Sequence, residues 1–353
     1  MKHRSGYAIP DIRLAYDGAV FEVSAYHRVY TNPDVRFWAG PSEVMTRLEA
    51  EAQLSQFIDM VIDRLASQGV GQTSAALRWA RVQASRQDPD ETAFCESAGA
   101  LRLDPYQIEE AAAASIEKAS EFFEGEPLND FLAGARTADR IRLIEWIERV
   151  EKLPRHKSRL PDLQPAAEAV AAKTPARAGE PGWSLGYRRA QALRKALGLS
   201  QAKRFPTFRT LAGALGASEG YALAPAVDGI RLLRSHREDG AHLHLRTHGT
   251  SAEAKASHLF TLARGIADVA CFPDTPRAPV NDLRSAYRQA AGRAFAAEFL
   301  APANEVQSMR GDGRDTVSIA DEFAVSTTVN ELQIENAQRI AAACGAMAAV
   351  AGP

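Results

Sequence analysis

Ser257-His-Leu-Phe-Thr-Leu-Ala-Arg-Gly-Ile-Ala-Asp268 is the stretch on which the expected fold depends. It lies inside a helix that we predict over residues 252–271. Arg264 and Asp268 are four residues apart, which places both side chains on one face of this helix and permits an ion pair between them. Gly265 follows Arg264 on the same helix. Arginine and glycine neither bind a metal ion nor act as a base, so of these three residues Asp268 is the one weak candidate for a metal ligand.

The segments around this helix predict an α+β fold that is mostly α. Upstream, residues 229–234 and 241–246 alternate apolar and polar side chains, and Glu238-Asp-Gly240 between them is typical of a hairpin turn. Downstream, helices are predicted over roughly 281–300, 316–323 and 326–343. We therefore expect residues 184–343 to form a domain in which a β-hairpin or small sheet packs on helices, followed by a tail over 344–353.

The first 153 residues predict an α-rich domain with a short β region. Alternating side chains over residues 11–38, with Asp17-Gly18 as a turn signal, predict a small antiparallel sheet. A long helix is predicted from Gly40 to about Ala66, with its apolar residues in one buried stripe. Further helices are expected at roughly 73–86, 90–98, 105–123 and 137–152.

Residues 154–183 begin with Pro154-Arg-His-Lys-Ser-Arg159 and continue with Ala, Pro and Gly, a composition that predicts a flexible linker. Charge is unevenly distributed around it. Residues 1–153 carry 17 Lys and Arg against 25 Asp and Glu, a net charge of −8, whereas residues 154–246 carry 16 against 7, a net charge of +9. Such a basic region can meet nucleic acid or an acidic protein surface, or it can be a solvated face.

Composition and cysteines indicate a cytoplasmic globular protein. Cys95, Cys271 and Cys344 are far apart and form no C-x-x-C pair, which predicts neither a disulfide framework nor a thiolate zinc site. The sequence contains no apolar run long enough for a membrane span and no glycine-rich phosphate loop.

Three runs in the second half carry a resemblance to a known family. They are Phe260-Thr-Leu-Ala263, Phe295-Ala-Ala-Glu-Phe-Leu-Ala-Pro302 and Ile319-Ala-Asp-Glu-Phe-Ala-Val-Ser326. In this order they resemble the segments before, between and after the zinc ligands of the ImmA/IrrE metallo-endopeptidase family. The resemblance covers about residues 185–342 and implies a zincin-like domain.

The resemblance also places that family's zinc-site positions on this sequence. The two histidines of its H-E-x-x-H motif fall on Arg264 and Asp268, and the catalytic glutamate falls on Gly265. The third ligand, a glutamate, falls on Gln289, and a further polar position falls on Arg293. Since every one of these residues differs from the family, we expect no catalytic residue, no cofactor and no zinc. Our hypothesis is that a guanidinium fills the space of the cation and that Asp268 and Gln289 satisfy it.

Histidines offer a minority alternative for a metal. Five of the eight cluster around the hairpin, namely His236, His242, His244, His248 and His258. His242 and His244 would share one face of a strand, which is a workable spacing for two ligands. No carboxylate or cysteine at a fixed offset completes the set, so we favour polar strand residues.

The function expected from these observations is a non-catalytic regulatory or scaffold protein that binds a protein partner, such as a regulator, a toxin or a complex subunit. The family resemblance implies a bacterial prophage, toxin-antitoxin, stress or phage-defence setting. One alternative is a DNA-binding transcriptional regulator that uses the basic region 154–246 or the helix pair near residues 93–120. The other is an active metallo-endopeptidase with an atypical site.

Overall fold

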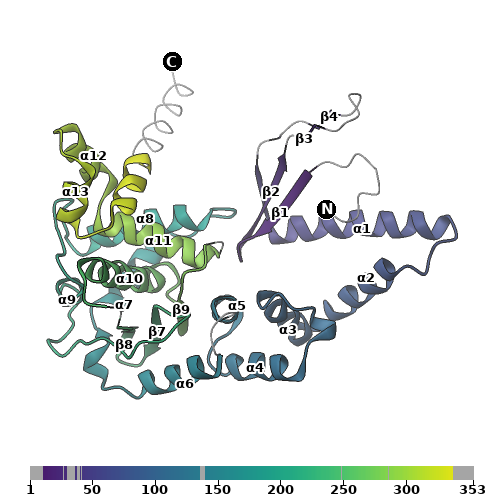
Figure 1. The fold of residues 1–353 in the computed structure, drawn as a ribbon, viewed down its shortest axis with the longest axis horizontal. Helices are drawn as coiled ribbons and strands as arrows, with labels where there is room; N and C mark the ends of the chain where they lie inside the picture. The colour runs from purple at the N-terminus through teal and green to yellow at the C-terminus, as the bar shows by residue number, and fades with distance from the viewer. Residues whose placement is uncertain are drawn as a thin grey trace. The chain divides into compact units, whose positions relative to one another are not determined.

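The structure is a computed structural model that describes residues 11–26, 28–29, 36–37, 40, 42–135, 140–247, 249–284 and 286–336. Its fold is α+β and mostly α, as predicted (Figure 1). The chain divides into two compact units. Unit 1 comprises Met1–Cys95 with Arg177–Pro181, and unit 2 comprises Glu96–Ala176 with Gly182–Pro353. The predicted division after residue 153 is therefore displaced, because residues 96–153 belong with the C-terminal half. The predicted tail over 344–353 lies outside the described residues.

Unit 1 contains a three-stranded antiparallel sheet. Strands β1 (Asp11–Tyr16), β2 (Val20–Tyr26) and β5 (Glu43–Thr46) lie in the order β1-β2-β5. The Asp17 carboxylate accepts hydrogen bonds from the backbone N–H groups of Ala19 and Val20, and Gly18 has a φ of 107°, so this turn joins β1 to β2 as the sequence predicts. Two short strands, β3 (Arg28–Val29) and β4 (Arg36–Phe37), pair with each other.

The long helix of unit 1, α1 (Arg47–Ser67), differs from its prediction in two ways. It begins later, because residues 43–46 form β5 and Thr46 caps the helix in a capping box with Glu49. Its predicted buried stripe is wrong, since Ala50 is the one buried residue of α1 and Phe57 and Met60 are exposed. Helix α2 (Ser74–Ser85) follows at its predicted position, and Thr73 caps its start.

The first helices of unit 2 lie before residue 153, in the part of the chain that was predicted to form the α-rich N-terminal domain. Helix α3 (Pro89–Ala100) crosses the unit boundary, and α4 (Glu110–Ser120) and α6 (Arg140–Glu151) match predicted helices. Helix α5 (Gly125–Gly134) was not predicted, and its Phe131 is buried against Phe123 with ring centroids 5.0 Å apart.

The prediction of a flexible linker over 154–183 is wrong. Residues Arg159–Leu160 form strand β6, and Leu163–Lys173 form helix α7. Leu163, Ala167 and Val170 of α7 are buried, because α7 packs against neighbouring helices of unit 2. The small side chains that suggested a linker are those that allow close helix packing.

Unit 2 contains a four-stranded antiparallel sheet in the order β6-β8-β7-β9. Figure 1 labels three of its strands, β7, β8 and β9. Strands β7 (Leu232–Arg237) and β8 (Gly240–Leu245) form the predicted hairpin, whereas β9 (Arg277–Val280) was not predicted. Helix α10 (Ala252–Cys271) packs on β7 and β8, and α11 (Tyr287–Leu300) packs on α10 and α8 (Gly182–Ala196). The remaining helices are α9 (Phe208–Gly213), α12 (Ala303–Gly311), α13 (Thr316–Phe323) and a helical segment over 327–336.

Candidate functional site

Gly265 lies where α10 packs closely against the sheet. A Cβ added at Gly265 would lie 2.8 Å from Leu232 Cδ1 on β7 and 3.1 Å from Leu243 Cδ1 on β8. A side chain at this position would therefore push into the apolar face of the hairpin. The position that the family resemblance assigns to a catalytic glutamate is filled by packed leucines in this structure.

Arg264 is buried, and the hydrogen-bond acceptors of its guanidinium are neutral oxygen atoms, while its Nε has no acceptor among the described residues. Its Nη2 donates to the backbone carbonyl of Asn281 and, over 2.8 Å, to Gln289 Oε1 on α11. Its Nη1 lies 3.7 Å from Asp282 Oδ1, a carboxylate that is largely exposed. Burial, followed by the nearby charge of Arg293, lowers the pKa of Arg264 to about 10, so the guanidinium keeps its charge at neutral pH.

Gln289 joins three elements at the centre of this site. Its Oε1 accepts from Arg264, and its Nε2 donates to Asp130 Oδ2 on α5 over 2.7 Å and to the backbone carbonyl of Pro279 on β9 over 3.0 Å. The Asn281 side chain donates to the Asp130 backbone carbonyl over 2.8 Å, which ties α5 to the segment after β9. Arg264, Gln289, Asp130 and Asn281 are all at most 7% exposed, and we call these four residues the closed core.

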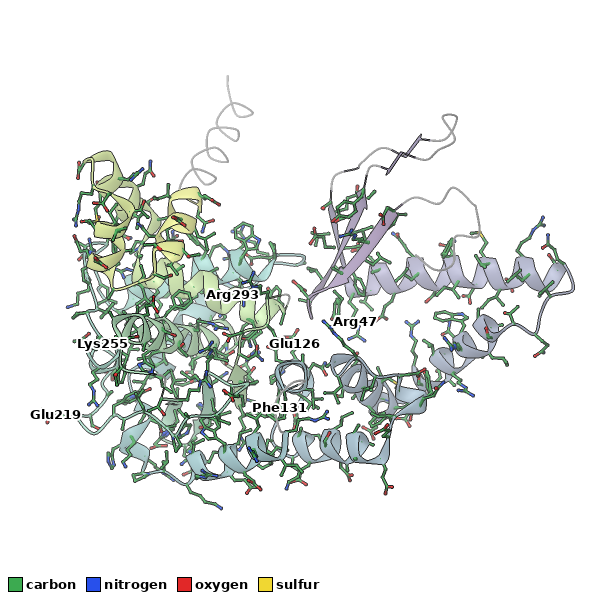
Figure 2. The ribbon with its side chains drawn as sticks, in the orientation of Figure 1. Arg47, Glu126, Phe131, Glu219, Lys255 and Arg293 are labelled. Carbon is green, nitrogen blue, oxygen red and sulfur yellow. The ribbon has the colours of Figure 1, made fainter. Side chains whose placement is uncertain are left out.

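Asp130 is the acidic member of the closed core. Burial raises the pKa of its carboxyl group to about 6, against the opposing effects of the Gln289 hydrogen bond and the charge of Arg288. Figure 2 labels its neighbour Phe131 on α5 and Arg293 on α11. The sequence reasoning missed Asp130, because the helix that carries it was itself not predicted.

The predicted ion pair between Arg264 and Asp268 is not formed. Asp268 is buried and pairs with two other arginines: Arg288 Nε on α11 lies 2.7 Å from Asp268 Oδ1, and Arg234 Nη1 on β7 lies 3.3 Å from Oδ2. Of the two partners that were predicted for the Arg264 guanidinium, Gln289 contacts it and Asp268 does not. Two arginines from facing elements satisfy the Asp268 carboxylate, so Arg264 finds its partners elsewhere.

Arg293 does not join the closed core. Its guanidinium donates to the backbone carbonyls of Leu283, over 2.6 Å, and Arg284, over 2.7 Å. Arg234, by contrast, is fully buried and also donates to the carbonyls of Phe272 and Pro273, which fixes the end of α10 to the sheet. The sequence did not predict this role, because polar residues of the hairpin were expected to be exposed.

Two histidines of the hairpin, His242 and His244, are buried and lie within hydrogen-bond distance of nearby side chains, whereas His236 is exposed. His242 contacts Ser158 Oγ through Nδ1 at 3.1 Å and Asp239 Oδ1 through Nε2 at 3.0 Å, and His244 Nε2 lies 3.4 Å from Ser235 Oγ. Burial lowers the pKa of His244 to about 3 and also lowers that of His242. Their rings stack 6.3 Å apart, and within the described ranges no group of three or more His, Cys, Asp and Glu side chains is arranged to hold a metal ion.

Several arginines of the basic region are internal. Arg189, Arg194 and Arg234 are at most 5% exposed and donate to backbone carbonyls, among them those of Thr174 and Phe299. These side chains stabilise unit 2 and do not face a phosphate backbone. Part of the net charge of +9 on residues 154–246 therefore belongs to arginines that are buried in the fold.

Comparisons with models of protein families, with curated proteins and with solved structures find no match for this chain. Across the part of the chain that the structure describes, no helix is long and apolar enough to cross a membrane. The site consists of a guanidinium, an amide and a carboxyl group that are buried in the interior of unit 2. The Gln289 amide is hydrogen-bonded to both the Arg264 guanidinium and the Asp130 carboxyl group.

Proposed function

We propose that the protein is a non-catalytic regulatory or scaffold protein and that it binds a protein partner through the sheet of unit 1. The supporting observation is an apolar face of that sheet. In the β1–β2 register Leu14 pairs with Val23 and Tyr16 pairs with Phe21, so their side chains share one face. Together with Ile12 these residues form what we call the apolar strand face.

The apolar strand face is open. Ile12 is 54% exposed, Leu14 is 49% exposed and Tyr16 is 41% exposed. Among the described residues of unit 1, only Val20 and Ala50 are fully buried apolar residues. A unit with so small a core gains stability when a partner covers its apolar surface, which is a property of interaction surfaces.

β1 also offers hydrogen bonds to a partner. It is an edge strand, because the order β1-β2-β5 leaves one side of β1 without a neighbouring strand in the described sheet. An extended peptide that adds to such an edge gains backbone hydrogen bonds, and its alternate side chains can pack on the adjoining apolar face. Helix α1 of the same unit also exposes large apolar side chains, as Phe57 is 59% exposed and Met60 is 61% exposed.

The closed core supports a role without catalysis. Arg264 and Gln289 are hydrogen-bonded to each other, and a Cβ at Gly265 would press against the packed leucines of β7 and β8, so the positions that would carry zinc chemistry serve the packing of unit 2. The resemblance to the ImmA/IrrE family then indicates an inherited scaffold in a bacterial regulatory or defence setting. The surface that binds the partner is then in unit 1.

The test uses two double variants of the same strand. Ile12→Ser with Leu14→Ser removes the apolar strand face, and Arg13→Ser with Ala15→Ser changes the opposite face of β1 and serves as the matched control. Tagged full-length proteins are expressed in the native host, and captured proteins are quantified by mass spectrometry. We expect a protein that is captured by the wild type and the control and lost from the first variant. Equal capture by all three proteins would contradict the proposal.

A further inference from the structure

A second surface of unit 2 has the properties of a ligand site. A cavity of about 500 Å³ lies beside the start of β7, the end of α5 and the segment after β9. Its charged lining residues are three arginines and one carboxylate, Arg102, Arg231, Arg246 and Asp282, and apolar side chains of Ile230 and Leu283 complete the wall. The volume is in the usual range for pockets that bind small molecules.

Asp282 forms ion pairs with one arginine that lines the cavity and with Arg264 of the closed core. Its Oδ2 lies 2.7 Å from Arg231 Nη2, and its Oδ1 lies 3.7 Å from Arg264 Nη1 at the buried side of the site. Burial by itself raises the pKa of Asp282, but the hydrogen bond from Arg231 and the charges of Arg231, Arg264 and Arg246 lower it overall. One carboxylate thus balances part of a larger positive charge.

Arg246 is the least satisfied of the arginines that line the cavity. Its side chain is only 11% exposed, and its Nε is buried without a hydrogen-bond acceptor among the described residues. Its ion partner, Asp228, is fully exposed and 3.8 Å away. Holding a guanidinium in this position is unfavourable unless something else neutralises it, because buried donors are normally bonded.

Arg102 adds an unusual backbone conformation. Its φ is 60°, in the left-handed region that favours glycine, at the turn that ends α3. The N–H of Leu103 donates to the carbonyl of Ala98 over 3.0 Å, which closes this turn. An arginine at such a position costs backbone energy and places a third cation at the cavity.

We propose that this cavity binds a small phosphate-bearing molecule, with Arg231 and Arg246 contacting the phosphate oxygens and Arg102 at the rim. Guanidinium groups match the geometry of phosphate through paired N–H donors, and three of them around one cavity supply more charge than a carboxylate ligand needs. The apolar wall formed by Ile230 and Leu283 would contact an organic part of the ligand. This site is in unit 2 and is independent of the partner surface in unit 1.

The test is calorimetric titration of the full-length protein at about 50 mM salt, where screening is modest. Inorganic pyrophosphate and AMP are the probes, and they distinguish an inorganic from an organic phosphate ligand. We expect saturable binding of at least one probe. Arg246→Gln and Arg231→Gln should each weaken it by roughly tenfold or more, the loss expected for a charged hydrogen bond. Lys255→Gln, which removes an exposed charge elsewhere in unit 2, should bind as the wild type does.

Two further measurements test the proposal. Asp282→Asn should tighten binding of the same probe, because it removes the carboxylate that competes with the phosphate for Arg231. Arg246→Gln without ligand should melt no lower than the wild type, since its guanidinium is poorly satisfied. The proposal is overturned if neither probe binds, if Arg246→Gln binds equally well, if Asp282→Asn weakens binding, or if a short DNA duplex binds where both probes fail.

Discussion

Replacing Asp130 with Asn tests whether the core around Arg264 and Gln289 is closed to water. In the wild type the Asp130 carboxylate accepts from Gln289 Nε2, and Asn can offer an oxygen in its place. Burial raises the pKa of Asp130 from 3.8 to about 6. Since one pKa unit corresponds to about 1.4 kcal/mol, burial of this carboxylate costs the folded state up to about 3 kcal/mol above pH 6.

The sign of the pH dependence follows from the direction of that shift. Between pH 3.8 and about 6 the folded state of the wild type holds a proton on Asp130 that the unfolded state releases. This contribution to stability is fully present below pH 3.8 and is lost as the pH rises through about 6. Asp130→Asn lacks the titration, so its free energy of unfolding relative to the wild type should rise by about 1–3 kcal/mol between pH 4 and 7.5.

The assay is urea unfolding of both proteins at a series of pH values, followed by circular dichroism. Glu124→Gln is the control, because Glu124 is an exposed carboxylate just before the same helix. Its difference from the wild type should change little with pH. A constant difference between Asp130→Asn and the wild type across this range would show that Asp130 is solvated and would refute the closed core.

The other predictions concern neighbouring positions and are checked by thermal or denaturant unfolding. Gln289→Glu should destabilise unit 2 by about 2–4 kcal/mol, because the new carboxylate would face Asp130 at 2.7 Å and the Pro279 carbonyl at 3.0 Å; a gain in stability would contradict this. Gly265→Ala should cost about 1–3 kcal/mol through the clash with the β7 and β8 leucines, and an unchanged midpoint would mean that α10 can move away. Asp268→Asn should cost about 3 kcal/mol or more, since it leaves two buried arginines without their carboxylate, and a neutral result would show that backbone carbonyls suffice.

Local signals in the sequence located several elements correctly. The hairpin over β7 and β8 follows from the Asp239-Gly240 turn, and α10 follows from apolar periodicity. Strand β9 was missed because it is short and contains Pro279, which is tolerated there because β9 is at an edge of the sheet. Helix α7 was missed because its many alanines resemble a linker, and only its packing partners show that the segment is ordered.

The sequence predicted one contact of the site correctly. Arg264 and Gln289 come together because α10 and α11 pack side by side. The i, i+4 spacing on α10 pointed to Asp268 as the partner of Arg264, but the spacing contains no information about Arg234 and Arg288, which approach from other elements. Long-range partners of this kind follow from the tertiary fold.

The apolar residues of α1 illustrate the opposite limitation. Their helical spacing indicated a buried stripe, and periodicity by itself does not say what covers an apolar face. In the structure Phe57, Met60 and Val61 remain exposed. The same pattern that predicts a core residue therefore also fits a surface that a partner covers.

We infer that the guanidinium of Arg264, hydrogen-bonded to Gln289, fills the position at which the resemblance in the sequence would place a zinc ion. The most direct test of this inference is the metal content of the full-length protein, purified with added zinc and measured by elemental analysis before and after dialysis against a chelator. We predict far less than one zinc per chain in both samples and an unchanged melting temperature. One zinc per chain that the chelator removes, with a fall in melting temperature, would contradict the account.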